Sequence, residues 1–90
     1  MRLDKFLKVS RLIKRRTLAK EVCDRGQVEV NGRPAKAGYE VREGDLLRIN
    51  FGHRLIKLQV LQTRESVPAA EAPGLYRILE DTGRTKLEDF

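Results

Sequence analysis

The chain has few of the residues that most often carry catalysis or metal binding. Its 90 residues include one cysteine, Cys23, one histidine, His53, and no tryptophan. A single thiol excludes an internal disulfide and favours a reducing compartment. One cysteine and one distant histidine also exclude a zinc site built from Cys and His ligands. We therefore expect no metal, no cofactor and no enzymatic activity.

The two remaining reactive side chains have structural explanations. Cys23 falls on the apolar stripe of a predicted helix, which favours a buried thiol over a nucleophile. His53 follows Gly52 in a predicted turn, which favours a solvated residue; a catalytic base and an RNA contact are the alternatives. The glycines are scattered single turn residues and form no phosphate-binding loop.

Long apolar runs are also missing. No stretch approaches the ~20 apolar residues of a membrane span. Basic residues interrupt every apolar run near the N-terminus, so no signal peptide is predicted. A chain of 90 residues is expected to form one small domain with a modest core. We expect a cytoplasmic monomer with no membrane contact.

Positive charge is what the sequence has in excess. Residues 1–25 contain nine basic and three acidic side chains, and their net charge of +6 equals that of the whole chain. Such a concentration favours a polyanionic partner, with nucleic acid ahead of an anionic membrane. A solvated helix face is the alternative. Three bases for each acid, on two helices that meet at a turn, make nucleic-acid binding the better interpretation.

The first third of the chain is predicted to form two helices. Apolar residues at i, i+3 and i+4 from Leu3 predict a helix that extends to about residue 10–13. Three adjacent cations at 14–16 predict an exposed turn. Thr17 is the expected N-cap of a second helix over 17–25, and Gly26 is the expected left-handed residue after its end.

The middle of the chain is predicted to form short strands. Alternation of polar and apolar residues predicts a strand over 27–30, followed by a type I′ turn at Asn31-Gly32. Pro34 places the returning arm at a sheet edge. Further strands are expected at 39–41, 46–51 and 55–61, with turns at 43–45 and 52–53.

The end of the chain is less regular. Residues 66–73 are predicted to be a linker or the weak start of a helix. Residues 75–79 fit a short helix or a strand, and the spacing of their apolar residues favours the helix. A loose tail is expected from Thr82 onward.

Helices followed by strands predict an α+β domain. We expect two short N-terminal helices packed on a small, mostly antiparallel sheet. The predicted organisation is a nucleic-acid-binding domain over residues 1–63 and a C-terminal extension with its tail over residues 64–90.

Structured RNA is the nucleic acid that the sequence favours. A DNA-reading helix-turn-helix needs Asn, Gln, Ser or Arg at the start of its second helix to reach base edges. The second helix of this chain starts with Thr17, Leu18 and Ala19, of which the last two are apolar. The aromatic residues form no stacking platform for single strands. Cations that follow a phosphate backbone fit better. If roughly four side chains contact phosphates, affinity should fall on the order of 100-fold between about 50 and 200 mM salt.

Residues 2–49 resemble the S-four RNA-binding domain, named for small-subunit ribosomal protein four. The resemblance rests on Arg2-Leu3-Asp4-Lys5, the predicted helix ending at Gly26, Val28-x-Val30-Asn31-Gly32, and Glu43-Gly44-Asp45. It implies an α+β fold of the kind predicted above (the alpha-L fold), with an RNA surface built from the two helices.

The chain is similar to small stand-alone members of this family that bind the large ribosomal subunit. The resemblance implies a role in ribosome-associated quality control, on large subunits obstructed by peptidyl-tRNA. Such a protein contacts rRNA and tRNA and holds the tRNA in the peptidyl site. Its implied partner RqcH brings alanyl-tRNA for C-terminal alanine tailing. The alternatives are a general rRNA-binding assembly or recycling factor, and a detached accessory module of an RNA-modifying enzyme.

The expected RNA-binding residues all lie in the basic N-terminal stretch. They are Arg2, Asp4, Lys5, Lys8, Arg11, Lys14, Arg15, Arg16 and Lys20. Asp4 is the exception in charge, because a carboxylate repels phosphate; it is expected to orient Arg2 or Arg16, to accept from a ribose or base donor, or only to complement the helix dipole. Arg2 and Arg16 are expected to face solvent, so that replacing them leaves the melting temperature unchanged.

Overall fold

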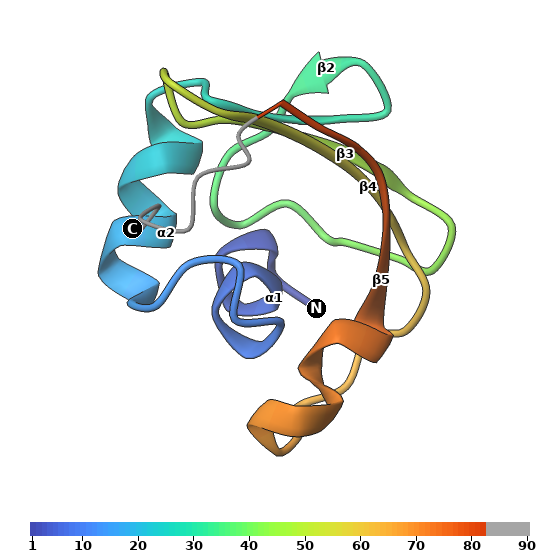
Figure 1. The fold of residues 1–90 in the computed structure, drawn as a ribbon. Helices are drawn as coiled ribbons and strands as arrows, with labels where there is room; N and C mark the ends of the chain where they lie inside the picture. Colours follow the sequence, from blue (N-terminus) through green and yellow to red (C-terminus); the bar gives the residue numbers. More distant parts are fainter. Residues whose placement is uncertain (83–90) are drawn as a thin grey trace.

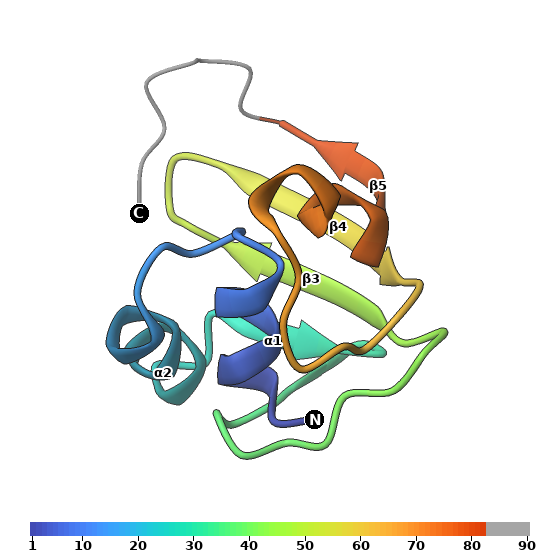
Figure 2. The same ribbon diagram turned by 90° about the horizontal axis from the view of Figure 1, so that it is seen from below.

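In the computed structural model, which describes residues 1–82, helices cover one face of a five-stranded antiparallel sheet (Figure 1). The sheet order is β2-β1-β3-β4-β5. The elements are α1 (Leu3–Val9), α2 (Arg16–Asp24), β1 (Val28–Val30), β2 (Arg33–Pro34), β3 (Leu46–Asn50), β4 (Leu55–Val60), the 3₁₀-helix η1 (Ala69–Leu75) and β5 (Tyr76–Asp81). The turned view shows α1 lying across the sheet with α2 beside it (Figure 2). The predicted α+β class and layer arrangement are confirmed.

The core lies between α1 and the sheet. Leu3, Phe6 and Leu7 occupy one face of α1 and are fully buried. On the sheet, Ile49 and Leu58 point to the same side and are buried as well. Each such side chain contributes about 1.5–3 kcal/mol when removed from water. The apolar spacing that predicted the first helix therefore marks the face that holds it to the sheet.

The first helix is shorter than expected. It ends at Val9, and the Ser10 hydroxyl donates to the Leu7 carbonyl oxygen at 3.2 Å. Arg11 then adopts a left-handed conformation with φ of 66°, which turns the chain. The turn brings Ile13 into the core, where it is fully buried.

The second helix begins one residue earlier than expected and without the predicted cap. Arg15 is its extended N-cap residue and makes no side-chain capping bond, so the assignment of Thr17 as the N-cap is wrong. Its end is as predicted. Gly26 has φ of 79°, and the amides of Gly26 and Gln27 donate to the carbonyls of Cys23 and Val22. This is the Schellman arrangement that satisfies the last carbonyls of a helix.

The hairpin after α2 is also as predicted. Asn31 and Gly32 have φ of 52° and 87°, and Val30 pairs with Arg33 across the turn. Pro34 lies in β2, at one edge of the sheet. The segment expected as a strand at 39–41 pairs outside the sheet: it forms a single bridge between Arg2 and Glu40. The start of the chain is thereby attached to this loop.

The predicted helix at 75–79 is wrong, because Tyr76–Asp81 forms β5 at the other sheet edge. Leu75 ends η1 and is buried, whereas Ile78 and Leu79 are 42% and 53% exposed. These three residues therefore form no buried helical stripe. Pairing with β4 satisfies backbone groups that β4 would otherwise leave open, and this long-range gain decides the conformation. The predicted tail is described only at Thr82; residues 83–90 lie outside the described part.

We predict that Gly26→Ala lowers the free energy of unfolding by about 1–2 kcal/mol, because a side chain disfavours positive φ. Urea unfolding measures the change. Gly74→Ala is the matched control, because its φ is not positive and an added Cβ would meet nothing within 4 Å. Equal stability of the two variants would contradict the assigned role of Gly26.

Candidate nucleic-acid interface

The carboxylate of Asp4 is the centre of the site. It is 2% exposed, near the start of α1. Arg2 Nε donates to Asp4 Oδ1 at 3.1 Å, and Arg16 Nε donates to Oδ2 at 3.3 Å. The Lys5 amide donates to Oδ1 at 2.8 Å. One buried acid therefore joins the beginnings of both helices.

The hydrogen-bond partners of Asp4 favour its ionised form. Burial by itself raises the pKa of Asp4, but hydrogen bonds from Arg2 and Arg16 outweigh burial and hold the pKa below its usual value. Both arginine side chains remain about half exposed, at 51% and 47%. Two guanidinium groups against one carboxylate leave a net positive charge, part of which faces solvent.

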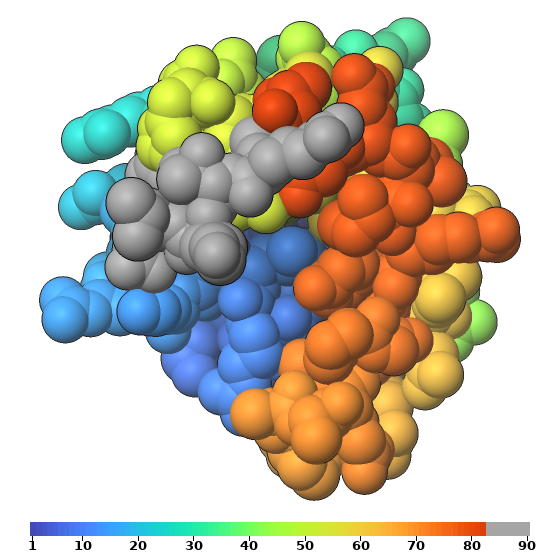
Figure 3. Space-filling model, viewed as in Figure 1, coloured from blue at the N-terminus to red at the C-terminus, as the bar shows by residue number. Residues whose placement is uncertain are grey.

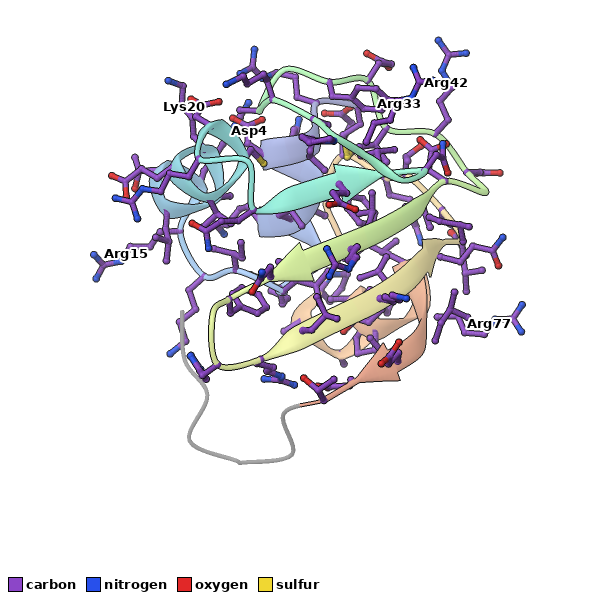
Figure 4. The ribbon with its side chains drawn as sticks, turned by 90° about the horizontal axis from the view of Figure 1, so that it is seen from above. Asp4, Arg15, Lys20, Arg33, Arg42 and Arg77 are labelled. Atoms are coloured by element: carbon purple, nitrogen blue, oxygen red, sulfur yellow. The ribbon has the colours of Figure 1, made fainter. Side chains whose placement is uncertain are left out.

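Lys20 of α2 and the N-cap residue Arg15 extend this positive surface. Lys20 is exposed and forms an ion pair with Asp24 at 3.6 Å, one turn further along the helix. Arg15 projects away from the body of the protein, and within residues 1–82 its side chain has no hydrogen-bond or ion-pair partner (Figure 4). Lys8 lies one turn after Asp4 on α1 and is half-buried. These three cations add to the positive charge of the two arginines that bind Asp4.

Lys5 and Arg11 have different neighbours from the rest of the predicted set. Lys5 forms an ion pair with Glu65, and Arg11 Nη2 donates to the Val67 carbonyl oxygen at 3.4 Å. Both cations thus contact the segment that leads into η1, which lies against the N-terminal elements in the space-filling view (Figure 3). Lys14 is exposed in the loop between the helices. The nine predicted residues therefore do not form one cluster.

Arg2 and Arg16 are exposed, as expected, but both also bind Asp4, so replacing either is now expected to lower the melting temperature. Each holds a buried carboxylate, which would be left with less compensation if either arginine were removed. The suggestion that Asp4 orients Arg2 or Arg16 agrees with these contacts. It holds for both at once.

Sequence reasoning missed several residues next to this site. Gly38 lies under Arg2: an added Cβ would stand 3.7 Å from Arg2 Nη1. Lys36 is exposed on the same loop, and its Nζ donates to the Asp24 carbonyl oxygen at 3.4 Å. Neither residue lies in a run of charge, so composition did not single them out. The pairing of residues 37–41 with the N-terminus is what brings them to the site.

The other reactive side chains do not join the interface. Cys23 is buried; burial first, then the charges of Asp4 and Asp24, raise the pKa of its thiol to about 12. This confirms the prediction of a buried thiol. His53 is exposed in the turn after β3. Across residues 1–82, no group of three or more His, Cys, Asp or Glu residues could hold a metal ion, and no helix is long and apolar enough to cross a membrane.

Comparison with known proteins places this chain in a family. The family model of the S4 domain, written S-four above, matches residues 1–47. The RQC P-site tRNA stabilizing factor of Halalkalibacterium halodurans is 54% identical over 88 residues, covering 98% of this chain and 100% of that protein. The factor of the same name from Bacillus subtilis is 53% identical over 81 residues, covering 90% and 94%.

A solved structure agrees with the fold. The structure titled as trimeric heat shock protein 15 of Vibrio cholerae has a TM-score of 0.81 and 33% identity, covering 87% of this chain and 80% of that one. Its likeness extends past the residues that the family model matches, and therefore includes part of the C-terminal segment.

We predict that Asp4→Asn lowers the free energy of unfolding at neutral pH by about 1–2 kcal/mol, because both arginines lose a charged acceptor. The pKa of Asp4 is lower in the folded state than its usual 3.8. Its contribution is therefore present above that value and is lost as pH falls through the folded-state pKa. The stability difference between wild type and Asp4→Asn should shrink below about pH 4.

Urea unfolding at several pH values measures this difference. Glu21→Gln is the matched control, because Glu21 is an exposed acid whose ion pair with Arg25 spans 4.0 Å. If the difference in free energy of unfolding between wild type and Asp4→Asn stayed constant from pH 7 to pH 3, the charge of Asp4 would not contribute to stability.

Proposed function

The chain belongs to the S4 domain family and, within it, to the RQC P-site tRNA stabilizing factors (RqcP), and we propose that it acts as one of them. It binds large ribosomal subunits obstructed by peptidyl-tRNA and stabilises the tRNA in the peptidyl site. The observation that carries this proposal is the end-to-end match at 54% identity with a factor of that name. The positive surface around Asp4 supports it, because RNA binding needs such a surface.

Asp4 prepares Arg2 and Arg16 for binding. A guanidinium has five N–H donors, and Asp4 takes one or two from each arginine, so the others stay available to a phosphate. A side chain already held in place loses less conformational freedom when RNA binds. The carboxylate thus raises affinity without touching RNA.

The proposed RNA contacts differ in importance. Arg2 and Arg16 are held by Asp4 and carry most of the binding energy, with Arg15, Lys20 and Lys8 around them. Lys14 adds an exposed cation in the loop between the helices. Lys5 and Arg11 contribute less, because Glu65 and the Val67 carbonyl already engage them.

The proposed role consists of binding and includes no step that makes or breaks a covalent bond. We therefore propose that the protein is not an enzyme. It contacts both large-subunit rRNA and peptidyl-tRNA, on ribosomes in the cytoplasm. By holding the tRNA in the peptidyl site, it supports C-terminal alanine tailing driven by RqcH. These finer assignments rest on the family resemblance.

We predict that Arg16→Gln weakens association with obstructed large subunits roughly tenfold, because a charge-assisted contact to phosphate is lost. Sedimentation with purified subunits carrying peptidyl-tRNA measures the association. Arg77→Gln is the matched control: Arg77 is an exposed arginine on β5, with no side-chain partner in the described part of the chain. Thermal unfolding of each variant checks that the fold persists, since Arg16 also binds Asp4.

Two outcomes would count against this proposal. Wild-type protein found only on assembly precursors would favour the general rRNA-binding alternative. Equal binding of Arg16→Gln and Arg77→Gln would remove α2 from the interface.

We predict that cells lacking the protein lose alanine tails on a stalled reporter, because the tRNA is no longer held for tailing. Mass spectrometry of the reporter's C-terminus measures the tails. Wild type and Arg77→Gln should restore them, and Arg16→Gln should restore them poorly. Alanine tails that persist in cells lacking the protein would show that tailing by RqcH does not need it.

A further inference from the structure

A second group of cations lies on β2 and on the loop that follows it. Arg33, Lys36 and Arg42 are all exposed. In the described part of the chain, the side chains of Arg33 and Arg42 make no hydrogen bond or ion pair. Figure 4 shows both projecting from the border of the molecule along which Lys20 and Asp4 also lie. These cations are outside the basic N-terminal stretch and have no part in the function proposed above.

The acids near this loop are largely engaged elsewhere. Glu40 is bound by the N-terminal amine, which is the main cause of its lowered pKa, and the charge of Arg42 adds a smaller effect. Asp45 accepts from the Arg42 amide at 2.9 Å and from the Asn31 side chain at 3.2 Å. Glu43 is the remaining exposed acid. Residues 33–45 contain three bases and three acids, and the N-terminal amine bound at Glu40 adds the charge that gives this surface a small positive excess.

The loop is attached to the helices by several hydrogen bonds. The amides of Leu3 and Asp4 donate to the carbonyls of Tyr39 and Ala37, at 2.8 and 3.1 Å. Asp24 Oδ1 accepts from the Ala37 amide at 3.4 Å. The cations of the loop and of the helices consequently keep fixed positions relative to one another.

Arg2 connects the two groups. Its guanidinium is held by Asp4 on one side and lies against Gly38 of the loop on the other. Tyr39 follows Gly38 in the chain and is 41% exposed. An exposed aromatic ring among cations is typical of RNA-binding surfaces, where a base stacks on it.

We propose that Arg33, Lys36 and Arg42 form a second phosphate-binding surface, which contacts an RNA backbone segment separate from the one bound by α2. The inference rests on the proposed function and deepens it. Holding one RNA in place against another requires contacts to both, which a single patch on α2 does not supply. The ligand is an RNA phosphodiester backbone, and its source is either rRNA or tRNA.

At the opposite edge of the sheet, most cations are paired with acids. On β5, Asp81 binds Arg54 at 2.7 Å and Glu80 pairs with Lys57 at 3.5 Å. Arg77 is the isolated cation of that strand. Arg33 and Arg77 are thus two exposed arginines on the two edge strands, and they make a matched pair for a test.

The test compares Arg33→Gln and Arg42→Gln with Arg77→Gln in binding to large subunits, with and without peptidyl-tRNA, between about 50 and 200 mM salt. Each loop variant should bind about 3- to 10-fold more weakly, and the slope of log affinity against log salt should fall by roughly 0.7 to 0.9 per contact. Arg77→Gln should bind like wild type. Melting temperatures should match, because none of the three side chains has a partner in the described residues.

The two subunit preparations identify the source of the phosphate. Loss on both preparations assigns the loop to rRNA, and loss only with peptidyl-tRNA present assigns it to tRNA; either supports the proposal. Binding of both loop variants equal to that of Arg77→Gln, while Arg16→Gln binds weakly, would overturn the second surface and leave the proposed function standing. Unchanged subunit binding with impaired recruitment of RqcH would overturn it in favour of a protein contact. Failure of wild type and Arg16→Gln alike to bind would overturn the proposed function itself.

Discussion

The ion pairs of Asp4 are the interaction on which the N-terminal half of this protein depends. A carboxylate that is 2% exposed is stable only when its charge is compensated. Arg2, just before α1, and Arg16, in the first turn of α2, supply that compensation. Arg16 is the first residue of α2, and its bond to Asp4 attaches the start of a helix that has no side-chain cap.

In the proposed function, stability and RNA binding therefore share residues. Arg2 and Arg16 each turn one edge of the guanidinium toward Asp4 and leave about half of the side chain exposed. Their removal affects both properties, so a loss of binding has to be read together with a melting curve. Arg33 and Arg42 are different, because within residues 1–82 they hold nothing in the fold. Substitutions in the loop separate recognition from stability more cleanly than substitutions at the helices.

The arrangement of cations follows from how the chain closes on itself. The first residues pair with the loop around Glu40, and the segment after β4 returns to α1, where Glu65 meets Lys5. The first contact adds the loop cations to the border of the molecule that carries α2. The second neutralises part of the charge on α1. The folded chain thus divides the cations of residues 1–25 between those that remain exposed and those that neighbouring groups compensate.

Local features of the sequence were sufficient for much of the fold. The buried face of α1, the left-handed Gly26 and the Asn31-Gly32 turn depend on neighbours a few residues away, and so the sequence by itself determined them. The excess charge of the first 25 residues likewise predicted a nucleic-acid partner.

Only the tertiary structure decided the rest. β5 exists because β4 offers it a pairing edge, although its apolar spacing favours a helix. Asp4 meets Arg16 across twelve positions of sequence, and Lys5 meets Glu65 across sixty. Such contacts between residues far apart in sequence decide which cations are paired with an acid and which remain exposed. No local pattern of residue types encodes these contacts.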